Sequence, residues 1–100
     1  MIELKFIIKV YDPHKLVSIS SNIGGLLERK VSIGGTQFGL SQKGCLIVAQ
    51  PVLKGPIGIN DAVNGILVKM TCNESEDAFL FISQLSSNLS PHESTIELVY

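Results

Sequence analysis

The sequence predicts an α+β domain built as an open-faced, two-layer sandwich, in which an antiparallel sheet carries helices on one face. Apolar and polar residues alternate along the first strand-like segment, which indicates a sheet with one face toward water. Two other segments place apolar residues at helical spacing, so each would present one apolar face to that sheet. The 100 residues match the size of one domain, and we expect a single domain over residues 1–100.

The first predicted strand covers residues 2–11. One of its faces carries apolar side chains at every second position, namely Ile2, Leu4, Phe6, Ile8 and Val10. The opposite face carries Glu3, Lys5, Ile7 and Lys9. This alternation is typical of a half-buried strand. Asp12-Pro13 should end it, because proline cannot continue a central strand.

A helix is predicted for residues 17–29. Its apolar residues recur at helical spacing: Leu16, Ile19, Ile23, Leu26 and Leu27. Ser18, Ser20 or Ser21 could cap its N-terminus. The Gly24-Gly25 pair weakens the middle of this helix by about 1 kcal/mol per glycine.

Residues 31–53 form a β region whose internal organisation the pattern leaves open. The apolar positions change parity after Gly34-Gly35, so we expect either a bulge or a two-residue hairpin turn there. Residues 42–44 are a second candidate for a turn. The short apolar strand over residues 45–49 should end near Pro51 or lie at an edge.

Beyond residue 53, we expect a short helical turn near residues 60–63 and a strand over residues 66–72. Asn73 and Glu76 have the spacing of a capping box. The helix that follows should end at Ser90-Pro91, with Phe79, Ile82, Leu85 and Leu89 on its apolar face. A last short strand is predicted for residues 95–100. The expected order is therefore strand, helix, two strands, short helix, strand and helix, with an additional C-terminal strand.

Charge and hydropathy argue against several classes of partner. Eight basic and nine acidic residues give a net charge of −1 without a basic run, so neither nucleic acid nor a membrane is expected as a partner. No apolar stretch approaches the roughly 18 residues of a membrane helix. The N-terminal residues lack the pattern of a signal peptide, so we expect a cytoplasmic location. Cys45 and Cys72 lie in apolar strand-like runs and are expected to be two buried thiols.

The second half of the chain resembles HPr, the histidine-containing phosphocarrier of the sugar phosphotransferase system. The similarity is strongest from Leu53 to Leu85. It depends on three segments, which are LKGPIGI (residues 53–59), GILVKM (65–70) and NESEDA (73–78). The predicted element order is also that of HPr, so the resemblance implies an HPr-like sandwich with an extra C-terminal strand.

The active-centre residues of HPr are mostly missing. The family places a histidine and a following arginine between the first strand and the first helix, where this chain reads DPHKLVSI over residues 12–19. His14 is the candidate phosphoacceptor, since a neutral imidazole is a nucleophile and helix N-terminal amides can hold phosphoryl oxygens. No arginine follows it, and Gly55 takes the place of the family's regulatory serine.

Two functions from different classes follow from this resemblance. The first is a non-catalytic HPr-like interaction or regulatory module, which the loss of the active centre favours. Its partner would be another protein, either a phosphotransferase-system component or a second copy of the chain. The alternative is a divergent phosphocarrier that is phosphorylated on His14. The expected contact surface comprises Lys15, Leu16, Ser18, Ile19, Gly55, Ile57 and Ile59.

Other chemistries have less support in the sequence. His14, Cys45, Cys72 and His92 have the composition of a zinc site without its paired spacing, so no metal or cofactor is expected. The glycines fit turns better than phosphate-binding loops. No Ser-His-Asp or Cys-His arrangement can be placed, so an independent enzyme is not expected. The expected solvent face has no aromatic residue for base stacking, which disfavours RNA; it carries Glu3, Lys5, Ile7, Lys9, Lys69, Thr71 and Glu97.

Overall fold

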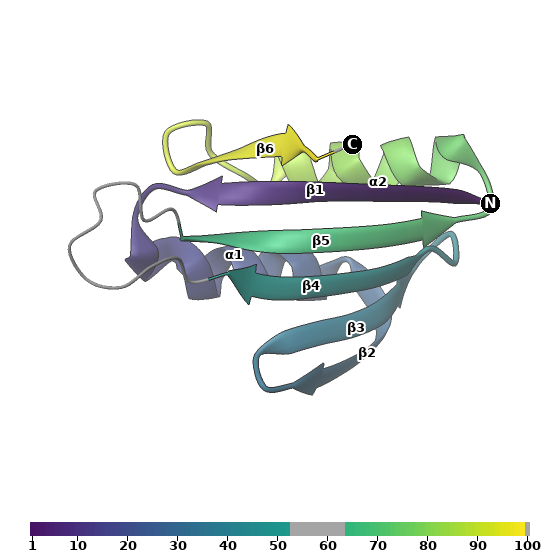
Figure 1. The fold of residues 1–100 in the computed structure, drawn as a ribbon, viewed down its shortest axis with the longest axis horizontal. Helices are drawn as coiled ribbons and strands as arrows, with labels where there is room; N and C mark the ends of the chain where they lie inside the picture. The colour runs from purple at the N-terminus through teal and green to yellow at the C-terminus, as the bar shows by residue number, and fades with distance from the viewer. Residues whose placement is uncertain (53–63, 100) are drawn as a thin grey trace.

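The computed structural model describes residues 1–52 and 64–99 of the chain (Figure 1). These residues form one antiparallel sheet of six strands and two α-helices. The strands are β1 (Ile2–Val10), β2 (Leu27–Ile33), β3 (Thr36–Ser41), β4 (Leu46–Val52), β5 (Asn64–Cys72) and β6 (Ser94–Leu98). The helices are α1 (Leu16–Gly25), preceded by the 3-10 turn η1 (Pro13–Lys15), and α2 (Ser75–Ser87).

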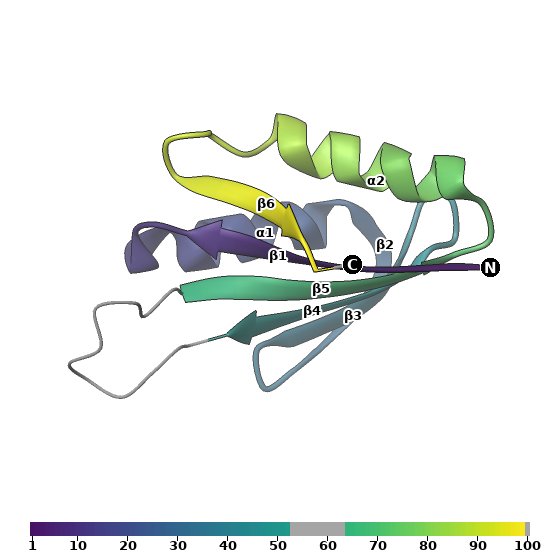
Figure 2. The ribbon, with the colours of Figure 1, turned by 45° about the horizontal axis from the view of Figure 1, so that its top comes forward.

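The strand order across the sheet is β2-β3-β4-β5-β1-β6, and all neighbouring strands are antiparallel. Strands β2 to β5 follow one another as a meander, and β1 lies between β5 and β6. Both helices pack on the same face of the sheet, which leaves the other face open (Figure 2). The predicted α+β class and the open antiparallel sheet are therefore confirmed. The HPr-like details of the fold stay a prediction, and the short helical turn expected at residues 60–63 lies outside the described residues.

The alternation along β1 determines which face of the sheet is buried. Phe6, Ile8 and Val10 lie in the core, whereas Glu3 and Lys9 lie on the open side. The same period continues through β4 and β5, and both helices add apolar residues from above. The core beside β1 consists of Ile19, Ile23, Leu27, Cys45, Ile47, Ala49, Ile66, Val68, Met70, Cys72, Ala78, Phe81 and Leu85.

Helix α1 is shorter than predicted. It ends at Gly25 instead of residue 29, and Leu27 to Arg29 belong to β2. The glycine pair explains the difference, because two low-propensity residues let the chain leave the helix there. The amide of Leu26 closes the last turn on the carbonyl oxygen of Ile23. Leu27 is then buried as the first residue of β2.

The caps expected from the sequence do not form. Lys15 precedes α1 and Glu74 precedes α2, and neither helix N-terminus has a side-chain cap hydrogen bond. The capping box expected at Asn73 and Glu76 is therefore wrong. Helix α2 also ends at Ser87, three residues before Ser90-Pro91. Its buried residues are Ala78, Phe81 and Leu85, so Leu85 lies in the core as predicted, but Phe79, expected on the apolar face, is exposed. Burial of their apolar faces against the sheet stabilises both helices, as is usual for helices this short.

Residues 31–52 contribute to three strands, whereas two strands were expected in this region. Gly34 and Gly35 have φ angles of 59° and 84°, so they form the two-residue turn with two positive φ angles that antiparallel hairpins favour. The hairpin alternative is therefore confirmed. The register of β2 against β3 shifts between Leu27 and Arg29. Beside that irregularity, a side chain at Gly39 would collide with the Arg29 carbonyl oxygen, so only glycine fits.

Cys45 and Cys72 are buried as expected, but they form a disulfide bond and are not two free thiols. Leu46 is paired with Thr71 across β4 and β5, so the same register places Cys45 opposite Cys72. Their Cα atoms are 4.4 Å apart, a spacing typical of residues directly opposite in antiparallel strands. The sequence indicates two apolar strands but not their register, which is why it does not predict the bond.

In the part of the chain that the structure describes, neither helix has the length and apolar character needed to cross a membrane.

Candidate functional site

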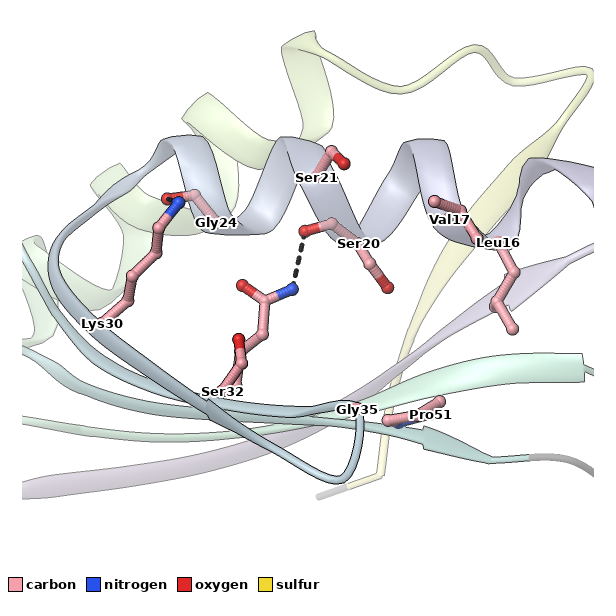
Figure 3. Close-up of a pocket in the computed structure, with 10 residues that line it drawn as sticks. Leu16, Val17, Ser20, Ser21, Gly24, Lys30, Ser32, Gly35 and Pro51 are labelled. Carbon is pink, nitrogen blue, oxygen red and sulfur yellow. Dashed lines mark hydrogen bonds between the residues drawn. The ribbon is translucent and has the colours of Figure 1, made fainter.

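A cleft of about 470 Å³ separates α1 from the helix-facing side of the β2–β3 hairpin (Figure 3). Leu16 and Val17 lie on its α1 wall, and Pro51 lies across from them on β4. Small residues of α1, including Ser20 and Gly24, form the rest of that wall. The hairpin approaches α1 closely there, since a Cβ atom on Gly24 would come within 2.8 Å of the Gln37 side-chain oxygen.

Two side chains of the hairpin bridge the cleft to the backbone of α1. Gln37 donates a hydrogen bond from Nε2 to the Ser20 carbonyl oxygen at 2.9 Å, which Figure 3 shows as a dashed line. Lys30 donates from Nζ to the Gly24 carbonyl oxygen at 3.4 Å, at the negative end of the helix dipole. The cation and the amide in the cleft are therefore already engaged with α1. Among the residues that line the cleft, no carboxylate or histidine is present for acid–base chemistry.

The first-helix residues expected to bind a partner are separated by the structure. Leu16 lines the cleft, Ser18 is exposed, and Ile19 is buried in the core, so the Ile19 side chain does not belong to an exposed contact surface. The Lys15 ammonium lies 3.7 Å from the Glu93 carboxylate. The second group of expected contact residues, Gly55, Ile57 and Ile59, lies outside the described residues.

His14 lies in η1, directly before α1, and 93% of its side chain is exposed. Its Nδ1 atom is 3.0 Å from Oδ1 of Asp12, and the same oxygen accepts the His14 backbone amide. The backbone amide of His14, together with its ring, lowers the pKa of the Asp12 carboxyl below its ordinary value. The ring is thus accessible, but a carboxylate is its immediate neighbour. That negative charge would repel a phosphoryl group on Nδ1.

The other groups that a phosphoryl or zinc site would need lie elsewhere. The one arginine of the sequence, Arg29, is in β2, while Lys15 is directed to Glu93. The sulfur atoms of Cys45 and Cys72 are bonded to each other. Within residues 1–52 and 64–99, no three His, Cys, Asp or Glu side chains are grouped so that they could hold a metal ion.

The most distinctive surface lies on the open face of the sheet, over β2, β3 and β4. Val31 is paired with Phe38 and Phe38 with Val48, while Leu40 is paired with Leu46. Directly opposite residues point to the same side of a sheet. That side faces away from the helices, because Ile47 and Ala49, which alternate with these positions, are buried. The open-face patch consists of Val31, Ile33, Phe38, Leu40, Leu46 and Val48.

The open-face patch exposes large apolar side chains to solvent. Val31 and Ile33 are 59% and 66% exposed, and Leu46 is 50% exposed. Phe38 and Leu40 in the centre are each more than a third exposed. Scattered surface leucines are ordinary, but six neighbouring apolar side chains on one sheet face are typical of an interaction surface.

Cations border the open-face patch on two sides. Arg29 is paired with Leu40 on the β2 side, and Lys69 is paired with Val48 on the β5 side. Lys5 is paired with Lys69 in the same row. The patch is therefore apolar at its centre and positively charged at its border.

The sequence missed this surface. The residues expected on the open face come from β1, β5 and β6, and they include no aromatic side chain. Phe38 now adds one, because the hairpin turn at Gly34-Gly35 places it opposite Val31. The change of parity after that glycine pair was the signal that could have located it.

Comparisons with known proteins identify no relative. No protein-family model, curated protein or solved structure matches this chain.

Proposed function

We propose that this chain is a non-catalytic protein-interaction module that binds a partner protein through the open face of β2–β4. The open-face patch carries the proposal, since burying one exposed valine, leucine or phenylalanine contributes about 1.5–3 kcal/mol. Burial of a few such side chains can exceed the entropy lost when two molecules associate, and the difference gives a moderate affinity. The border of Arg29 and Lys69 would select partners that bring carboxylates.

The sequence resemblance supports a related but finer proposal, an HPr-like regulatory module. In that proposal the partner is a phosphotransferase-system component or a second copy of the chain, and the location is cytoplasmic. Its contact surface would include the start of α1, where Ser18 is exposed. The two surfaces lie on opposite faces of the sheet, so mutations can separate them.

Binding should be lost in Phe38→Glu and retained in Ser18→Glu. The first change places a carboxylate in the open-face patch, and the second places one in the first turn of α1, where the helix dipole tolerates it. We expect Phe38→Glu to weaken binding of partners captured from native lysate at least tenfold, which corresponds to about 1.4 kcal/mol. Far-UV circular dichroism would show that both variants are folded.

The reverse result would overturn this assignment of the surface. If Ser18→Glu released the captured partner and Phe38→Glu kept it, the contact would lie at the start of α1, as the resemblance implies.

A phosphocarrier that uses His14 is the alternative, and the exposure of its ring before α1 favours it. The adjacent Asp12 carboxylate disfavours it. We therefore expect no acid-labile phosphate on the native chain after incubation with phosphoenolpyruvate and the general phosphotransferase enzymes. Phosphate that appears in the native chain and disappears in His14→Ala would establish the phosphocarrier instead.

A further inference from the structure

Helix α2 exposes two large apolar side chains outside its buried face. Ala78, Phe81 and Leu85 point into the core, while Phe79 is 63% exposed and Leu80 is 39% exposed. Both side chains present apolar surface that a partner would bury with a gain in free energy. The outer face of α2 is therefore a second candidate contact surface.

The N-terminal turn of α2 gives this outer face a negative charge. Glu74 precedes the helix, and Glu76 and Asp77 lie in its first turn. Glu76 is three residues before Phe79 and four before Leu80, so the three side chains share one face. The outer face of α2 thus joins an apolar pair to carboxylates.

The two surfaces are complementary in charge and in size. The open-face patch is bordered by Arg29 and Lys69, whereas the α2 surface carries Glu76. Three neighbouring strands span about 10 Å from first to last, close to the roughly 10 Å diameter of a helix with its side chains. A 13-residue helix such as α2 is about 20 Å long, which exceeds the patch along the strands.

We propose that copies of this chain associate head to tail, with Phe79 and Leu80 of α2 in one copy packed on the open-face patch of the next. This inference rests on the proposed use of the open face and names a second copy as its occupant. Phe38 and Val31 would be covered by the apolar pair. Glu76 would lie near Lys69 of the acceptor.

Charge favours this arrangement over two open faces packed together. Among the described strand residues, the open face carries Arg29, Lys5, Lys9 and Lys69 against Glu3 and Glu97. Its net charge is positive, so a face-to-face dimer would join two surfaces of like charge. Helix α2 on the open face instead joins opposite charges.

The symmetry of the contact determines what assembles. Each copy gives α2 to one neighbour and accepts α2 from another, so the contact is heterologous and continues as a chain or closes as a ring. Only two large apolar side chains of α2 enter the contact, so we expect weak, concentration-dependent association with a dissociation constant on the order of 100 μM.

Sedimentation velocity of two complementary variants tests the proposal. Phe38→Glu removes the acceptor surface and Phe79→Glu removes the donor surface, so each variant alone should remain a monomer at concentrations where the native chain exceeds the mass of a dimer. An equimolar mixture retains one intact donor and one intact acceptor. It should form a dimer and nothing larger. Leu80→Glu provides a second donor variant in case Phe79→Glu is poorly folded.

A charge exchange tests the orientation. Lys69→Glu and Glu76→Lys should each weaken association severalfold, and the double variant should recover most of it. A native chain that stays monomeric to about 1 mM would overturn the inference. So would a native oligomer whose two variants do not associate when mixed, because the mixture contains an intact donor surface and an intact acceptor surface.

The two proposals fail in different ways. If the native chain is a monomer and Phe38→Glu still releases a partner protein, a second copy does not bind the open-face patch. The proposed function then remains intact. If the Phe38→Glu variant self-associates as the native chain does and also keeps its other partners, both proposals are wrong.

Discussion

Replacement of Phe81 by alanine should lower the free energy of unfolding by about 3–5 kcal/mol. Phe81 is 2% exposed and is among the largest fully buried side chains of the described residues. It points from α2 toward the sheet, so truncation would leave a cavity that strands β1 and β5 cannot fill without distorting their pairing. Urea unfolding followed by far-UV circular dichroism measures the loss.

Phe79→Ala is the matched control, because it removes the same atoms from the same helix. Phe79 is 63% exposed, so we expect a change within about 0.5 kcal/mol. The measurement is made at low micromolar protein, where self-association through Phe79 does not add stability. Equal losses for the two variants would mean that α2 packs through a different face from the one described.

The alternation of residues 2–10 was sufficient to predict both the first strand and its buried side, because one face is apolar over its full length. The second helix was predicted as an element, but its buried face was predicted only in part. Phe79 was expected on the apolar face and is 63% exposed, whereas Phe81 is buried. The end of α1 was harder to predict, because Leu26 and Leu27 fit a helix and a strand equally well. The glycine pair before them decides the outcome.

The open-face patch depends on how the strands pair, and the sequence alone does not give the register of that pairing. Phe38 becomes an open-face residue only once the hairpin turn defines its register against Val31 and Val48. A slip of one residue would turn it into the core. The exposure of Phe79 was not predicted either, because Phe79, Ile82 and Leu85 have the spacing of an apolar helix face, and the packing of Phe81 on the sheet decides against it.

The predicted contact residues had a different limitation. They came from the resemblance to a family, which does not indicate which side chains are exposed. Ile19 is an example, because it lies near the start of a helix but its side chain is part of the core. His14 is exposed as a nucleophile must be, yet Asp12 beside it gives the site a charge that the resemblance did not imply.

Reduction of the Cys45–Cys72 bond should lower the free energy of unfolding by about 3–4 kcal/mol. The bond closes a loop with a sequence separation of 27 residues, and the unfolded chain gains entropy when that loop opens. The bonded sulfurs are also buried at the ends of β4 and β5, where two free thiols would need more space. Urea unfolding with and without a reductant gives the difference.

The double variant Cys45→Ala/Cys72→Ala supplies the control, because its stability should not respond to the reductant. Disulfides persist in oxidising compartments and are rare in a reducing cytosol. The same bond therefore bears on the location predicted from the sequence. A native chain whose stability ignores the reductant, and whose two cysteines alkylate in urea without prior reduction, would carry two thiols, as expected for a cytoplasmic protein. Cysteines that resist alkylation in urea until a reductant is added would show that the bond is present in the native chain.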